Sequence, residues 1–379
     1  MNINEKKTKI MIFQKRSSKK TKQRNFQVNH RNLDIVKEFT YLGVTLNQTG
    51  DFLVHQEKSR EKALNALFSI NRHLDLKKLR PRQANKIYNS MVSPILTYAS
   101  EIWGVYQKHD YKKWDKGPTE KMQLRFCKYY LGVNNKSTNI ACRAELGIYP
   151  LKIFIDKMIL KYYNHLFSLP DNSFAKQALL LSKSMFERGK TCYHSQLISM
   201  LNFYDINNTL TNAFTNNTIN NYHERMKKHY LKEWKSHLVQ STKLQLYKSI
   251  KYDYKSEEYL DIIKNVEQRR LLTKFRISNH KLAIETGRYG KQKTQVDQRI
   301  CVLCNNREIE TEEHMLLHCP CYSSLRQKCF GKILVETEII SSNDCINISI
   351  LLSSKNPKII FYISKFIEKC FELRATLVQ

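Results

Sequence analysis

The chain has 379 residues, 41% of them hydrophobic, and its 64 Lys and Arg against 34 Asp and Glu give a formal net charge of +30. This apolar content excludes wholesale disorder, and a soft prior of about 150 residues per domain predicts two or three domains. Only 10 Gly and 7 Pro are present, which is typical of a mainly α fold. The charge indicates a polyanionic partner, RNA or DNA first and an acidic membrane surface second.

The absence of targeting patterns in this sequence and its use of cysteine together predict the cellular compartment. No apolar run approaches the roughly 20 residues of a membrane span, and the N-terminal sequence lacks a signal-peptide pattern. We therefore expect an intracellular protein, nuclear or cytoplasmic, that does not enter a membrane. In a reducing compartment its 10 cysteines are expected to be thiols or metal ligands rather than disulfides. The oligomeric state stays open.

The first 46 residues carry the strand-like patterns of the chain. Residues 10–13 form a short apolar run, and residues 39–46 are β-branched and aromatic with one glycine, as in a strand or hairpin arm. A basic connection over 15–31 separates them. Two or three strands are too few for a stable sheet in water, so we expect a small mixed α/β piece that is less protected from exchange than 57–160.

Helical periodicity dominates the next region, 55–204. Its first helix is indicated by apolar residues at helical spacing: Ala63, Leu67, Ile70 and Leu74. Pro81 is expected to begin the following helix, and Pro94 to kink or end it. Further helices are predicted over about 119–131, 150–168 and 172–190.

Composition divides the rest of the chain. Residues 205–221 are rich in Asn and Thr and are predicted to form a linker. The complete division comprises 1–54, 55–204, 205–221, a basic helical region 222–299, a Cys/His cluster 300–322 and a C-terminal helical segment 323–379.

The Cys/His cluster has the pattern C-x2-C-x9-H-x4-C, formed by Cys301, Cys304, His314 and Cys319. A tight turn between the first two cysteines can aim both sulfurs at one point, which tetrahedral zinc requires. Because the protein would fill all four positions, the predicted zinc is structural, not hydrolytic. The alternative is a plain turn and helix with buried thiols, since free cysteine packs like a small apolar residue.

The geometry of the fourth ligand depends on a short helix over 311–318. Thr311 is its expected N-cap, and Pro320 is expected to end it so that Cys319 can turn toward the other ligands. His318 and Cys321 remain alternative fourth ligands, because His318 lies one turn from His314.

Basic and aromatic residues alternate between positions 222 and 254, and a second basic group precedes the cluster. Cations neutralise phosphates, and flat rings stack on unpaired bases. The candidate nucleic-acid-binding residues of these two stretches are Lys227, Lys228, Lys232, Trp234, Arg269, Arg270 and Arg276. The alternative is an amphipathic helix whose aromatics are core and whose lysines are solvated.

No catalytic residue can be nominated. The chain contains no adjacent pair of aspartates, and its acidic residues are spread along charged helix faces. A two-metal polymerase or nuclease centre needs carboxylates clustered around ions about 4 Å apart. The sequence therefore predicts binding rather than catalysis.

Several segments, in order, resemble the carboxy-terminal part of the reverse transcriptases of non-LTR (LINE-type) retrotransposons. Asn4, Lys7, Thr8, Lys9, Met11 and Phe13 resemble the segment after the catalytic aspartate pair, and Tyr41-Leu42-Gly43 resembles the primer-grip hairpin. Residues 88–103 (YNSMVSPILTYASEIW) resemble the helical thumb signature. Residues 276–289 and the Cys/His cluster resemble the carboxy-terminal Cys/His motif and its lead-in.

The resemblance implies a palm edge and primer grip over 1–54, a thumb over 55–204 and a zinc knuckle over 300–322. It implies that Lys7 or Lys9 lies near the incoming nucleotide, that Tyr41, Leu42 and Gly43 meet the primer end, and that the knuckle helps to hold template RNA or target DNA. The family's catalytic aspartates match no position here. We therefore expect a truncated protein that binds RNA or DNA without synthesis.

Three further interpretations stay open. One is an intact RNA-directed DNA polymerase whose gene model is incomplete. Another is a non-catalytic, zinc-containing nucleic-acid-binding module. The last is a basic helical protein with no nucleic-acid role.

Overall fold

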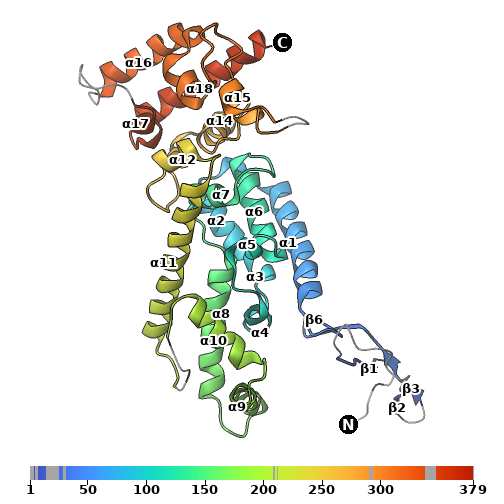
Figure 1. Cartoon of the computed structure of the whole chain (residues 1–379). Coiled ribbons are helices and arrows are strands. Elements are labelled where there is room, and N and C mark those ends of the chain that lie inside the picture. The colour runs from blue at the N-terminus through green and yellow to red at the C-terminus, as the bar shows by residue number, and fades with distance from the viewer. Residues whose placement is uncertain are drawn as a thin grey trace. The chain divides into compact units, whose positions relative to one another are not determined.

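The computed structural model describes residues 4, 7–13, 25–28, 31–207, 210, 212–289, 293–337 and 347–378. It confirms the mainly α prediction: strands of two to four residues lie before residue 48, and helices form most of the chain after that point (Figure 1). None of the described helices combines the length and apolarity of a membrane span.

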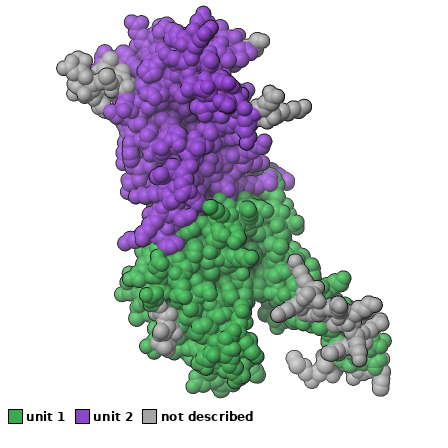
Figure 2. All heavy atoms as spheres, in the orientation of Figure 1, with its two compact units in different colours: residues 1–69, 88–123, 151–226 green, residues 70–87, 124–150, 227–379 purple. Residues whose placement is uncertain are grey.

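The chain forms two compact units, each built from separate stretches of sequence (Figure 2). Unit 1 comprises residues 1–69, 88–123 and 151–226, and unit 2 comprises 70–87, 124–150 and 227–379. Three of the five boundaries fall within helices α1 (Leu53–His73), α6 (Pro118–Leu131) and α11 (Asn216–Gln240). Helix α11 begins inside the predicted linker, where Ile219 is buried.

The strands of unit 1 form three separate pairs. Their bounds are β1 (Lys9–Ile10), β2 (Gln27–Val28), β3 (Arg31–Asn32), β4 (Asp34–Ile35), β5 (Glu38–Tyr41) and β6 (Val44–Asn47). β1 pairs with β4 in parallel, whereas β2–β3 and β5–β6 are antiparallel, with Phe39 opposite Leu46. Thr45 is the one buried residue among those described before residue 51. This low burial agrees with the expectation of weak protection there.

The tip of the β5–β6 hairpin is a two-residue turn. Leu42 and Gly43 both have left-handed backbone angles, with φ of 45° and 82°. Such turns match the right-handed twist of the flanking strands, and glycine adopts the conformation without steric cost.

Helices complete unit 1. After α1 come the π-helical turn η2 (Tyr88–Val92), α3 (Ser93–Leu96), α4 (Ser100–Trp103), η3 (Gly104–Tyr106), α5 (Tyr111–Trp114), α8 (Leu151–Ser168), α9 (Phe174–Glu187) and α10 (Tyr193–Phe203). Pro94 has no backbone N–H and cannot donate the hydrogen bond that a helix interior requires. The π-helical turn η2 directly precedes α3, which contains Pro94 and ends two residues after it. The expected effect of Pro94 is confirmed.

The core of unit 1 depends on close packing between the α4–η3 segment and α8. A Cβ placed on Gly104 would lie 2.4 Å from Cγ2 of Ile155 and 3.3 Å from Cδ1 of Ile159. Both isoleucines are fully buried. Glycine is therefore required at this position because the side chains of Ile155 and Ile159 lie directly against its backbone and leave no room for a Cβ.

Unit 2 contains the remaining helices. They are η1 (Leu76–Lys78), α2 (Pro81–Ile87), α7 (Asn139–Leu146), α12 (Gln245–Ile250), α13 (Tyr259–Ile262), α14 (Val266–Arg276), α15 (Ala283–Thr286), η4 (Val296–Gln298), η5 (His314–His318), η6 (Pro320–Tyr322), α16 (Ser323–Thr337), α17 (Ile348–Ser353) and α18 (Pro357–Leu377). Helix α18 packs against α14 and α16 through buried residues such as Ile363 and Ile367.

The two glycine sites predict stability changes of opposite sign. Gly104→Ala should lower the free energy of unfolding by about 1–3 kcal/mol, because the added methyl overpacks the contact with Ile155. Gly331→Ala, in α16 with open space around the added Cβ, should raise it by about 0.5–1 kcal/mol through helix propensity. Urea unfolding followed by circular dichroism measures both, and a neutral Gly104→Ala would contradict the packing argument.

Candidate metal centre

The first two cysteines lie in a hairpin-like turn of unit 2. The backbone N–H of Cys301 donates to the Glu308 carbonyl at 2.9 Å, and that of Glu310 donates to the Arg299 carbonyl at 2.8 Å. Ile300 and Ile309 form a β-bridge between these bonds. The reversal of the chain brings Cys301 and Cys304 to the same end of the turn, as the C-x2-C spacing predicts.

The other two ligand candidates lie on a short helix after this turn. The Thr311 hydroxyl accepts a hydrogen bond from the His314 backbone N–H at 3.0 Å, so the predicted N-cap is confirmed. The helix ends with the π-helical turn η5, and Cys319 leaves it in an extended conformation before Pro320. This exit turns the sulfur of Cys319 back toward the imidazole of His314.

Four donor atoms meet at this point. One ligand atom from each of Cys301, Cys304, His314 and Cys319 lies within 4.8 Å of the other three, and all four residues are buried. Four ligands arranged tetrahedrally at about 2.3 Å from an ion lie roughly 3.8 Å from one another, so a small closure would seat a metal. The cluster could therefore hold a metal ion.

The structure selects Cys319 among the three candidates for the fourth ligand. His318 is exposed to solvent. The thiol of Cys321 donates to the backbone carbonyl of Leu303 at 3.0 Å and does not belong to the group. Cys319 is fully buried within it.

Neighbouring groups orient the ligands. Nδ1 of His314 lies 2.6 Å from a carboxylate oxygen of Glu308, and Nε2 lies 3.4 Å from the sulfur of Cys304. A carboxylate on one ring nitrogen fixes the tautomer that leaves the other free to bind metal. Arg326 donates to the carbonyls of Leu316 at 2.8 Å and Cys319 at 2.9 Å, which holds the end of the helix.

Burial disfavours thiolates in the cluster unless a cation is bound. It raises the pKa of the Cys301 and Cys319 thiols, because a thiolate loses water on burial. A bound cation reverses this effect and deprotonates its ligands. Since four protein groups fill the coordination shell, the arrangement suits a structural ion and leaves no position for an activated water.

Two glutamates beside the cluster were not singled out from the sequence. Glu310 accepts hydrogen bonds from Arg374 of α18, at 3.0 Å from Nη2, and from the Ala283 backbone at 2.6 Å. Glu312 accepts from the Ser278 hydroxyl and lies 2.9 Å from Nε2 of His280. Burial acts to raise the pKa of Glu312, but the hydrogen bond and charge of His280 together lower it. The sequence does not distinguish them from Glu308 and Glu313, because all four acids lie within residues 308–313.

Helix α11 divides the candidate binding residues between its two faces. Lys228 and Lys232 are exposed, as a phosphate contact requires. Lys227 is half-buried, with its ammonium 5.6 Å from the centre of the Tyr149 ring. Trp234 is only 2% exposed and packs edge-to-face on Tyr254 at 5.1 Å. Trp234 is therefore a core residue and is not available to stack on a base.

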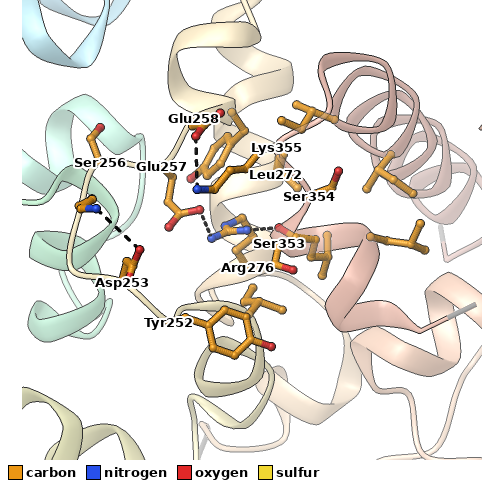
Figure 3. Close-up of a pocket in the computed structure, with 17 residues that line it drawn as sticks. Tyr252, Asp253, Ser256, Glu257, Glu258, Leu272, Arg276, Ser353, Ser354 and Lys355 are labelled. Atoms are coloured by element: carbon orange, nitrogen blue, oxygen red, sulfur yellow. Dashed lines mark hydrogen bonds and ion pairs between the residues drawn. The ribbon is translucent and has the colours of Figure 1, made fainter. Parts of the chain in front are cut away.

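Arg276 also belongs to the core of unit 2. Figure 3 shows its guanidinium pointing at the carboxylate of Glu257, with Nη2 at 2.7 Å, beside a cavity of about 220 Å³. Nη2 also lies 3.2 Å from Glu145, and Nη1 donates to the Leu352 carbonyl. Burial acts to lower the pKa of Arg276, but the two carboxylates raise it overall. A buried arginine held by these acceptors cannot reach a phosphate.

The other two arginines differ in exposure. Arg269 is buried and donates to the carbonyls of Leu260 and Lys77. Arg270 keeps 19% of its side chain exposed and forms an ion pair with Glu267 at 3.0 Å. Of the three candidate arginines, Arg270 is the one with surface exposure.

The N-terminal candidates lie in unit 1. Lys7 is exposed, whereas Lys9 forms an ion pair with Asp34 at 2.5 Å. Tyr41 is 63% exposed at the hairpin tip, and Gly43 lies against the ring of Tyr98. Tyr41 and Gly43 share the tip of the β5–β6 hairpin, whereas Lys9 lies in β1 and Lys7 precedes that strand.

Comparisons with protein-family models, curated proteins and solved structures found no match. Within the described residues, the Cys301 cluster is the one group of three or more His, Cys, Asp or Glu side chains placed to hold a metal. The cluster is therefore the strongest chemical feature in the described part of the chain.

Ligand substitutions test the site directly. Purified wild-type protein should contain one metal ion per chain, and Cys301→Ser or Cys304→Ser should abolish stoichiometric metal because each removes a thiolate ligand. His318→Ala and Cys321→Ser are matched controls that should retain it. Inductively coupled plasma mass spectrometry gives the content, and full occupancy in Cys304→Ser would contradict the assignment.

Proposed function

We propose that this chain binds RNA or DNA through exposed lysines, that a structural zinc ion fills the Cys/His cluster, and that the chain does not synthesise nucleic acid. The observation that carries the proposal is the division of helix α11 into a buried aromatic face and an unpaired basic face. Lys228, Lys232 and Lys235 are spaced four and three residues apart, so they lie along one side of the helix. All three are exposed.

The opposite side of α11 anchors the helix in unit 2. Tyr230, Trp234 and Leu238 recur every four residues and are 4%, 2% and 5% exposed. The three lysines have no acidic partner among the described residues, so their charge is free to attract phosphates. Together with the net charge of +30, this face favours electrostatic binding of a nucleic-acid backbone.

Zinc is the metal that the donor set favours. Three thiolates and one imidazole form a soft, four-coordinate set that is typical of structural zinc sites. The Glu308 carboxylate on His314 supplies the outer partner that such sites use. When bound, zinc would tie the turn carrying Cys301 and Cys304 to the helix carrying His314 and Cys319.

We further propose a relationship to the non-LTR reverse transcriptases. The order of the resembling segments supports it, as does one contact within unit 1: the Tyr98 hydroxyl donates to the Leu42 carbonyl at 2.8 Å. This bond joins the stretch that resembles the thumb to the tip of the hairpin that resembles the primer grip. Under this proposal the exposed Tyr41 faces the end of a bound strand.

Salt dependence measures the electrostatic part. Wild-type affinity for a labelled single-stranded oligonucleotide should fall by roughly two and a half decades between about 50 and 200 mM salt if about six phosphates are neutralised. Changing Lys228, Lys232 and Lys235 together to Gln should reduce the slope of log K against log salt by about two, at roughly 0.7 per phosphate for single strands. The matched Lys→Arg triple variant should keep the slope, and a flat wild-type response would overturn the proposal.

Primer extension tests the absence of synthesis. With an RNA template, a DNA primer, all four deoxynucleotides and Mg²⁺ or Mn²⁺, the chain should add no nucleotide, because its sequence has no adjacent aspartates to hold two catalytic ions. An active reverse transcriptase in parallel controls the assay. Template-dependent extension by this chain would show that distant carboxylates converge on two metal ions.

A further inference from the structure

A large open hollow of unit 2 remains without a role. Its volume is about 1100 Å³, and it lies among the end of α14, the loop after that helix, α15 and the last turns of α18. Its apolar wall includes Val133, Leu271 and Phe371. Asn279, Lys274 and Lys281 also line it. The hollow therefore combines apolar surface with an amide and two cations.

Tyr289 supplies an oriented aromatic surface. Its hydroxyl lies 3.0 Å from a carboxylate oxygen of Glu285 and accepts from the Lys243 ammonium at 2.9 Å. These two bonds fix the ring, although 47% of the residue remains exposed to solvent. A flat ring that is fixed yet open is a platform on which a base can stack at little entropic cost.

The amide and the lysines are free to bind. Oδ1 of Asn279 accepts from the Asn134 backbone N–H at 3.2 Å, which leaves its two Nδ2 donors without an acceptor among the described residues. Lys274 and Lys281 likewise have no ion-pair partner in the described part of the chain. A planar base with carbonyl acceptors, joined to phosphates, uses all of these groups. An apolar peptide side chain would leave the amide and both cations unused.

Glu312, which lies beside the Cys/His cluster, holds the loop that carries Asn279. Glu312 binds the side chains of Ser278 and His280 on either side of it, each at 2.9 Å. Ser278 has a left-handed backbone with φ of 52°, a conformation that needs such support in a residue other than glycine. The position of the amide thus depends on a residue two places from His314.

We propose that this hollow is a subsite for an unpaired nucleobase of a bound single strand. The base stacks on Tyr289, its edge accepts hydrogen bonds from Asn279, and the flanking phosphates lie against Lys274 and Lys281. The inference rests on the proposed nucleic-acid binding and adds to it a preference for single strands over duplexes.

The test compares a single-stranded oligonucleotide, its duplex, and the same strand with abasic residues, by fluorescence anisotropy with the full chain at one fixed salt concentration. Wild type should bind the intact single strand roughly tenfold more tightly than the abasic strand, the scale of one base–aromatic stack. Tyr289→Leu should lose most of this difference, whereas Tyr289→Phe, which keeps the ring but loses the two bonds that orient it, should lose clearly less. Asn279→Asp should weaken single-strand binding, because it replaces the amide donors with negative charge.

The outcomes separate the two proposals. If wild type binds no oligonucleotide, the proposed function is overturned and the subsite with it. If wild type binds all three ligands equally and Tyr289→Leu changes nothing, the function stands and the subsite is overturned. Circular dichroism and metal content of each variant verify that the fold is intact, and a Tyr289→Phe loss matching that of Tyr289→Leu would also overturn the stacking role.

Discussion

Two buried glutamates, Glu310 and Glu312, join the Cys/His cluster to the rest of unit 2. They flank Thr311, the N-cap of the helix that carries His314, and between them they hold α18, the start of α15 and the loop after α14. Removing one partner of a buried ion pair typically costs about 3–5 kcal/mol, because the other charge is left without compensation. The segment that carries the metal ligands therefore also sets the positions of three segments distant in sequence.

Because of this arrangement, a metal ion bound to the cluster would stabilise more of unit 2 than the segment that carries the four Cys and His residues. The ligand segment itself contributes few large buried side chains, among them Met315, Leu316 and Tyr322. Small elements of this kind commonly depend on a metal for a defined structure, and the free energy of metal binding then becomes free energy of folding. Because the glutamates belong to the same element, that energy also supports the contacts made by Arg374 and His280.

Much of the fold was predictable from local pattern, and the remainder depends on contacts that local pattern does not contain. Helix α8 and the four-residue Cys/His cluster follow from short-range spacing, and Thr311 and Pro320 act as expected. Helix α11 instead begins in an Asn- and Thr-rich stretch, since burial of Ile219 overrides low intrinsic propensity. Spacing likewise cannot reveal that Glu145 and Glu257 enclose Arg276, because one of these pairs spans 131 residues.

The same contacts show that arginine and lysine side chains have different roles in unit 2. Arginine offers five donors in a fixed fork and suits buried pairs, whereas lysine is a strongly hydrated point charge. Arg269, Arg276 and Arg374 accordingly serve the interior of unit 2, and the exposed side of α11 carries lysines. Because these arginines are buried, the net charge of +30 overstates the positive charge that is available to bind phosphates. Under the proposed function, lysine contacts of this kind give affinity for a nucleic acid without fixing its geometry. A preference for single strands over duplexes then has to come from a rigid element. The loop that Glu312 holds through Ser278 and His280 is such an element.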